Sequence, residues 1–208
     1  MVATGGDAWP FATDLMPWAA TRHSAEAAHA RAGRLDTVVL GAGGFPKYVN
    51  LFDCPVEAWD AVVNLNLHSM FYLLKTAAPL MVTAKYGRFV TLLSIAARSG
   101  VNLNSPHYTA AKDGVLALTQ QAALDLGRYG ITINAVAPAN VLTPRTLSIR
   151  SLERIAHLEK NQAGGTTRPA RRNCRGDSVP SASRSVLHHG RHAGCEQCRY
   201  DDISVLLY

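Results

Sequence analysis

Three short runs of β-branched and other apolar residues, each ended by glycine, serine or proline, constrain this sequence most. They are "LDTVVLGAGG" (35–44), "GRFVTLLS" (87–94) and "ITINAVAP" (131–138). Between them lie long stretches whose apolar residues recur with helical spacing. An alternation of strands and long helices is typical of a parallel sheet, because parallel strands must be joined by a crossover. The sequence therefore predicts an α/β fold in which a parallel sheet is flanked by helices.

Three helices accompany these strands. The first lies in "DLMPWAATRHSAEAAHARAGRLD" and is expected to end at Gly33, since glycine adopts the left-handed conformation that closes a helix. The second is predicted over residues 57–84, and the third begins at Tyr108 and ends before Gly130. Ligands of parallel sheets bind beyond the carboxyl ends of the strands. Functional residues are therefore expected in the loops after these strands.

Composition narrows the class of protein. The chain has 208 residues, about the length of one domain, and no run approaches the roughly 18 apolar residues that span a membrane. The amino terminus lacks the pattern of a secretion signal, so a cytoplasmic location is expected. Half of the net charge of +6 comes from residues 161–208, and no basic helix face with interleaved aromatic residues is visible. We expect neither nucleic-acid nor membrane binding.

Tyr108 and Lys112 stand four residues apart at the start of the third helix, so they lie on the same helix face. A lysine cation one turn away favours the ionised form of a tyrosine, which suits it to proton transfer with an alkoxide. Ser94 ends the preceding strand and can bind a substrate oxygen at the same sheet edge. The alternative is that Tyr108 and Lys112 are only a surface pair and Ser94 only a turn residue.

An ordered set of motifs resembles the short-chain dehydrogenase/reductase family from about Gly5 to Leu147. The motifs are "ATDL", "WDAVVNLNLHSMF", "GRFVTLLSIAA", "YTAAK" and "ITINAVAPANVLTP". The resemblance implies a Rossmann-type sheet and a catalytic set made of Asn66, Ser94, Tyr108 and Lys112. In this set Asn66 would hold a water that relays protons to Lys112, although an ordinary buried amide is the alternative. The cofactor-binding residues that the resemblance implies are Asp14, Leu15, Ala42, Gly43, Tyr108, Lys112, Pro138, Val141 and Thr143.

The resemblance also implies the partners of the chain. The cofactor would be NAD or NADP, which the sequence does not distinguish, and the substrate a small alcohol or ketone. A homo-oligomer would form through the helices 57–84 and 107–129. The activity would be hydride transfer between nicotinamide and a carbonyl or alcohol carbon.

The family's first βαβ unit and its Gly-x-x-x-Gly-x-Gly loop have no counterpart before "GGDAWPFATDL", so we expect an amino-terminally truncated domain. "LGAG" also stands where the family has Asn-Asn-Ala-Gly, and "PAN" where it has Pro-Gly. Two interpretations therefore stay open. The chain is an active reductase, or it is an inactive remnant or dimerisation partner whose cofactor binding is lost.

The carboxyl-terminal segment has a different composition. We divide the chain into a partial Rossmann-type domain (1–162) and an irregular tail (163–208). The tail contains Cys195 and Cys198 near three histidines, a spacing compatible with zinc. We favour a frameshift instead, because codons read one base later can restore family-like segments in two places. No metal is expected.

Overall fold

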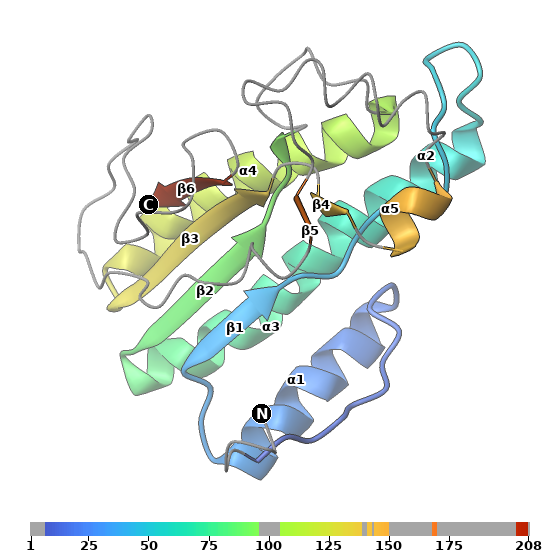
Figure 1. Cartoon of the computed structure of the whole chain (residues 1–208). Helices are drawn as coiled ribbons and strands as arrows, with labels where there is room; N and C mark the ends of the chain where they lie inside the picture. Colours follow the sequence, from blue (N-terminus) through green and yellow to red (C-terminus); the bar gives the residue numbers. More distant parts are fainter. Residues whose placement is uncertain are drawn as a thin grey trace.

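Three parallel strands form the centre of the structure, a computed structural model that describes residues 7–95, 105–138, 141–142, 144–149, 168–169 and 203–207. The strands are β1 (Thr37–Leu40), β2 (Gly87–Leu92) and β3 (Ile131–Pro138), in that order across the sheet. Their carboxyl ends point the same way (Figure 1). This confirms the predicted α/β fold class. β2 ends two residues before Ser94, so Ser94 stands just beyond the strand.

A fourth strand, β6 (Ile203–Leu207), pairs antiparallel with β3. β5 (Arg168–Pro169) pairs with β4 (Val141–Leu142) in a separate two-stranded sheet. β5 and β6 belong to the segment for which the sequence predicted an irregular tail. The rest of residues 163–208, including Cys195 and Cys198, lies outside the described residues, so the division into domain and tail stays a prediction.

The segment predicted as one helix over 57–84 is a continuous rod of three parts (Figure 1). They are α2 (Val56–Val63), a π-helical turn η2 (Asn64–His68) and α3 (Ser69–Ala84). The helical prediction is confirmed, but the π-turn was not foreseen. Such turns widen a helix locally and often occur at functional sites. The third helix, α4 (Pro106–Gly127), begins two residues before the predicted Tyr108.

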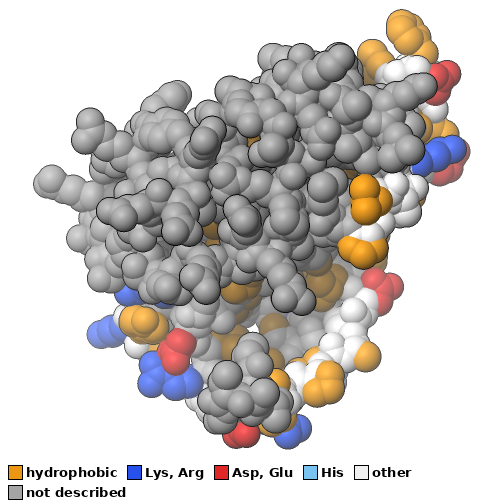
Figure 2. All heavy atoms as spheres, in the orientation of Figure 1, with side chains coloured by type: hydrophobic (Ala, Val, Ile, Leu, Met, Phe, Trp, Pro, Cys, Tyr) orange, Lys and Arg blue, Asp and Glu red, His pale blue; other side chains and the backbone are white. Residues whose placement is uncertain are grey.

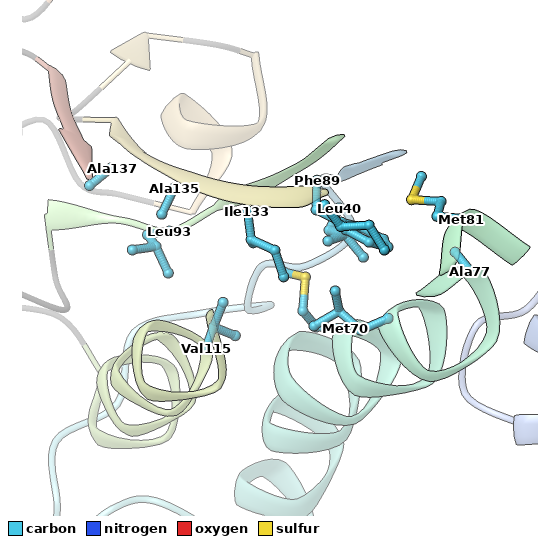
Figure 3. Packing of buried hydrophobic residues seen from close by; sticks show 12 residues of the cluster. Leu40, Met70, Ala77, Met81, Phe89, Leu93, Val115, Ile133, Ala135 and Ala137 are labelled. Carbon is cyan, nitrogen blue, oxygen red and sulfur yellow. The ribbon is translucent and has the colours of Figure 1, made fainter. Parts of the chain in front are cut away.

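The hydrophobic core lies between the sheet and the two helices α3 and α4 (Figure 3). Phe89 and Ile133 are fully buried and face Met70 of α3 and Val115 of α4. Alternate residues of β2 are buried, as expected for a strand with one face on helices. Burial of this apolar area is the main contribution that holds helices and strands together.

The first helix, α1 (Trp18–Ala32), packs on α3 and contacts it through the rings of Trp18 and Tyr72, whose centroids are 5.4 Å apart. As predicted, Gly33 ends it in the left-handed conformation with φ of 77°. α1 begins toward the end of the molecule at which the parallel strands finish (Figure 1).

The described surface mixes hydrophobic and charged side chains (Figure 2). Among the described residues, the large hydrophobic residue with the highest exposed fraction is Phe52, at 95%, in the loop before α2. Among the described helices, none combines the length and the apolar character needed to cross a bilayer.

Candidate active site

The site is built where β1 and β2 end, in front of the first turns of α4. The loop Gly41–Gly44 leaves β1 there, and Ser94, which is half-buried, follows β2. The backbone N–H of Leu93 donates a 2.8 Å hydrogen bond to the carbonyl of Val136 on β3. The polypeptide that carries Ser94 therefore stays attached to the sheet for one residue beyond β2.

Lys112 reaches from α4 to the end of β2. Its Nζ donates a 2.7 Å hydrogen bond to the carbonyl oxygen of Leu92 and lies 5.7 Å from the centroid of the Tyr108 ring. Only 4% of the residue is exposed, and this burial lowers the pKa of the Lys112 ammonium from 10.5 to about 8. With a pKa of about 8, the ammonium can exchange a proton at mildly alkaline pH.

Asn66 lies in the π-turn η2 and is fully buried. Its Oδ1 accepts a 2.9 Å hydrogen bond from the Gly44 N–H, and its Nδ2 donates to the carbonyls of Gly44 and Val62, both at 2.8 Å. Both amide protons are therefore used. A water held by this side chain would have to donate to the remaining lone pair of Oδ1.

Gly43 is packed between the two polar side chains just described. A Cβ at this position would lie 2.5 Å from Asn66 Oδ1 and 3.4 Å from Lys112 Nζ, and its φ of 148° is unusual for other residues. The loop after β1, the π-turn and α4 therefore meet at this glycine.

Tyr108 is half-buried on the first turn of α4, and its ring packs against Phe45 with 4.7 Å between centroids. The N-cap residue of α4, Ser105, is buried, and its Oγ accepts a 2.9 Å hydrogen bond from the Val49 N–H. These contacts attach the start of α4 to the segment that follows the loop Gly41–Gly44, called the glycine loop below. The orientation of Tyr108 thus depends on the ring contact with Phe45 and on the hydrogen bond between Ser105 and Val49.

The remaining predicted cofactor residues are more scattered. Asp14 and Leu15 precede α1, where Asp14 Oδ1 accepts from the Met16 N–H at 3.0 Å and the Leu15 carbonyl accepts from Thr21 Oγ1 at 3.0 Å. Ala42 belongs to the glycine loop, Pro138 ends β3 and Val141 begins β4. Thr143 lies outside the described residues.

Arg145 and His107 lie near the site and were missed by the sequence reasoning, whereas Gly44 belongs to the loop after β1 where functional residues were expected. Gly44 contacts Arg145, since a Cβ on Gly44 would lie 2.6 Å from Arg145 Nη2. His107, beside Tyr108, is 1% exposed, its Nδ1 has no hydrogen-bond partner, and burial lowers its pKa. The sequence signals that could have indicated the contact between Gly44 and Arg145 are the glycine pair Gly43-Gly44 and the arginine that follows Pro144. Within the described residues, no group of three or more His, Cys, Asp or Glu side chains could hold a metal.

Comparison with known proteins gives consistent matches. The model of the family described as short chain dehydrogenase matches residues 1–154. The chain is 32% identical over 133 residues, 64% of its length, to 2-dehydro-3-deoxy-L-rhamnonate dehydrogenase (NAD(+)) of Sphingomonas sp. and covers 53% of that protein. It is 34% identical over 149 residues, 71% of its length, to (3R)-3-hydroxyacyl-CoA dehydrogenase of Canis lupus familiaris and covers 57% of it. The chain thus spans about half the length of these curated relatives.

A solved structure has the same fold. It is a 7 alpha-hydroxysteroid dehydrogenase complexed with NADH and 7-oxo glycochenodeoxycholic acid, with a TM-score of 0.73 and 28% sequence identity. The match covers 81% of this chain and 65% of the hydroxysteroid dehydrogenase chain.

Proposed function

The chain belongs to the short chain dehydrogenase family, and from this premise we propose that its site interconverts an alcohol and a carbonyl compound with NAD or NADP. The observation that carries the proposal is the buried ammonium of Lys112 beside Tyr108 at the carboxyl end of β2. The names of the relatives, among them an NAD(+)-dependent dehydrogenase, support the reaction class.

The hydrogen bonds of Lys112 support binding of the nicotinamide ribose. An ammonium group has three N–H donors, and within the described residues only one is used, by the Leu92 carbonyl. A buried cation with free donors is costly, so hydroxyl oxygens at this position would be favourable partners. Residues expected to hold the cofactor are Lys112, Tyr108, Ala42 and Gly43. When bound, nicotinamide supplies or accepts the hydride at the substrate carbon.

Tyr108 acts as the acid in reduction and the base in oxidation. Its hydroxyl gives a proton to the oxygen of the carbonyl while that carbon becomes an alcohol carbon, and takes it back in the reverse reaction. The Lys112 cation stabilises the tyrosinate that remains. Ser94, just beyond β2, hydrogen-bonds the substrate oxygen and orients it. Asn66 holds the Gly44 backbone and offers one lone pair to a relaying water.

A titration with NADH and NADPH, followed by nicotinamide fluorescence, tests the proposal in the 208-residue chain. Saturable binding together with turnover of a panel of alcohols and ketones would support it. Absence of binding up to millimolar cofactor would contradict it and favour the alternative, an inactive relative that keeps these residues without the cofactor.

Assembly through the helices 57–84 and 107–129 is part of the proposal. Large hydrophobic side chains are exposed on these helices: Trp59 at 38%, Phe71 at 43% and Leu124 at 75%. An interface between two such helix pairs would cover these apolar side chains and remove them from water. Sedimentation velocity should give a dimer or larger species, and the Leu124→Glu variant should shift it toward monomer. A monomeric wild type would contradict this assembly.

A further inference from the structure

Arg145 stands at the start of α5 (Pro144–Ser148). Its side chain packs against Gly44 in the loop that leads from β1 to the site. Its Nη2 is 3.5 Å from the carbonyl oxygen of Phe45, and its guanidinium occupies the space that a Cβ on Gly44 would fill. Gly44 has φ of 132°, so both its conformation and its missing side chain permit the approach. The arginine is therefore seated against one specific stretch of backbone.

Phe45 connects this guanidinium to the acid/base residue. The Phe45 residue is buried, its carbonyl faces Arg145, and its ring packs on the ring of Tyr108. Arg145 thus contacts the carbonyl of Phe45, and Tyr108 contacts its ring. The position of the guanidinium and the position of the Tyr108 ring are therefore both set by Phe45.

The charge of Arg145 has no counterion within the described part of the chain. No Asp or Glu of these residues lies within 4.0 Å of the guanidinium, and the bond to the Phe45 carbonyl uses one of its five N–H donors. Lys112 differs, because it is buried and bonded to the Leu92 carbonyl. The exposed guanidinium retains the planar pair of donors that matches a carboxylate.

We propose that Arg145 binds the carboxylate of the substrate, so that the site selects oxo and hydroxy acids over neutral ketones and alcohols. The proposal rests on the proposed function for its acid/base residue and specifies the substrate class of the same site. The second anionic group that could reach a guanidinium here is a phosphate of the cofactor. We assign Arg145 to the substrate because its contact is with the residue that packs on Tyr108.

Binding can be measured without turnover. The probes are acetoacetate, 4-oxopentanoate and 4-oxocyclohexanecarboxylate, each beside its carboxamide, observed by saturation-transfer NMR on the full chain. The wild type should bind at least one acid about tenfold to a hundredfold more tightly than the matching amide, as expected for a charge-assisted pair. The acid with the largest preference reports the separation between Arg145 and Tyr108.

The Arg145→Met variant should lose this preference and bind acid and amide alike. Arg145→Lys keeps the charge but not the planar donor pair, and should retain only part of it. Arg128→Met at the end of α4 is the matched control, since it removes the same charge elsewhere. Melting temperatures of all variants show whether the fold is kept. If Arg145→Met unfolds, the acid preference of Arg145→Lys is compared with that of the wild type instead.

Three results would overturn the proposal. They are equal binding of acid and amide by the wild type, equal losses in Arg145→Met and Arg128→Met, and weaker ADP binding in Arg145→Met with the acid preference unchanged. The last result would assign the arginine to the cofactor. Failure of the proposed function looks different, because an acid preference that depends on Arg145 would persist in a chain that turns over no substrate.

Discussion

The ammonium of Lys112 donates a 2.7 Å hydrogen bond to the carbonyl oxygen of Leu92, the last residue of β2. One side chain thus joins α4 to the strand end from which Ser94 follows. The contact is made at a cost, since the cation is almost fully buried. Sites that keep such groups usually trade stability for chemistry.

This cost predicts a pH dependence of stability. The pKa of Lys112 is about 8 in the folded chain and near its ordinary value of 10.5 in the unfolded chain. Between these values the unfolded state binds more protons, so the free energy of unfolding should rise with pH in this window. The rise should be about 3 kcal/mol. Urea titrations at several pH values measure it.

Substitution Lys112→Met should remove this rise, because methionine does not titrate. Lys75→Met is the control, since Lys75 is exposed on α3 and should leave the rise unchanged. An equal pH dependence in wild type and Lys112→Met would contradict a depressed pKa of this residue.

Gly43→Ala should destabilise the chain by roughly 1–3 kcal/mol, because its Cβ would meet Asn66 Oδ1 and its φ is strained for alanine. The control is Gly127→Ala at the end of α4, where a Cβ meets nothing within 4 Å. That change should stabilise by about 0.5–1 kcal/mol, as alanine favours helix. Chemical denaturation of the wild type and both variants measures these changes in the free energy of unfolding. A neutral Gly43→Ala would show that the loop moves freely.

Asn66→Leu keeps the approximate volume but removes three hydrogen bonds with the backbone. The Gly44 N–H and carbonyl would be left without this partner, so a loss of about 2–4 kcal/mol is expected. Asn50→Ala tests an exposed asparagine that also accepts backbone hydrogen bonds and should cost far less. Equal losses at the two positions would refute the role of Asn66 as a buried connector.

Tyr108→Phe should lower kcat by about 10²–10⁴ while the melting temperature stays near that of the wild type, because only the hydroxyl is removed. Tyr86→Phe is the control, since Tyr86 is 40% exposed and precedes β2 at its amino end. Steady-state rates with the best substrate of the panel give the comparison. Undiminished turnover by Tyr108→Phe would rule it out as the acid/base residue.

Much of the fold could be predicted from the sequence. The three β-branched runs, the glycine after α1 and the spacing of apolar residues in α4 act over a few neighbouring positions. Backbone sterics and helical periodicity are local, so they can be recognised in the sequence. The pairing of Tyr108 with Lys112 on one helix face follows from the same periodicity.

Tertiary structure alone decided which residues meet across the site. Asn66 holds Gly44 over 22 positions of sequence, and Arg145 reaches Phe45 over 100. No local pattern predicts such pairs, because their energies depend on how the sheet, the π-turn and α5 pack. The burial of Lys112 and His107 belongs to the same class, since desolvation is a property of everything that surrounds a group. Motif spacing determined which residues are available for chemistry, and packing determined which of them are in contact.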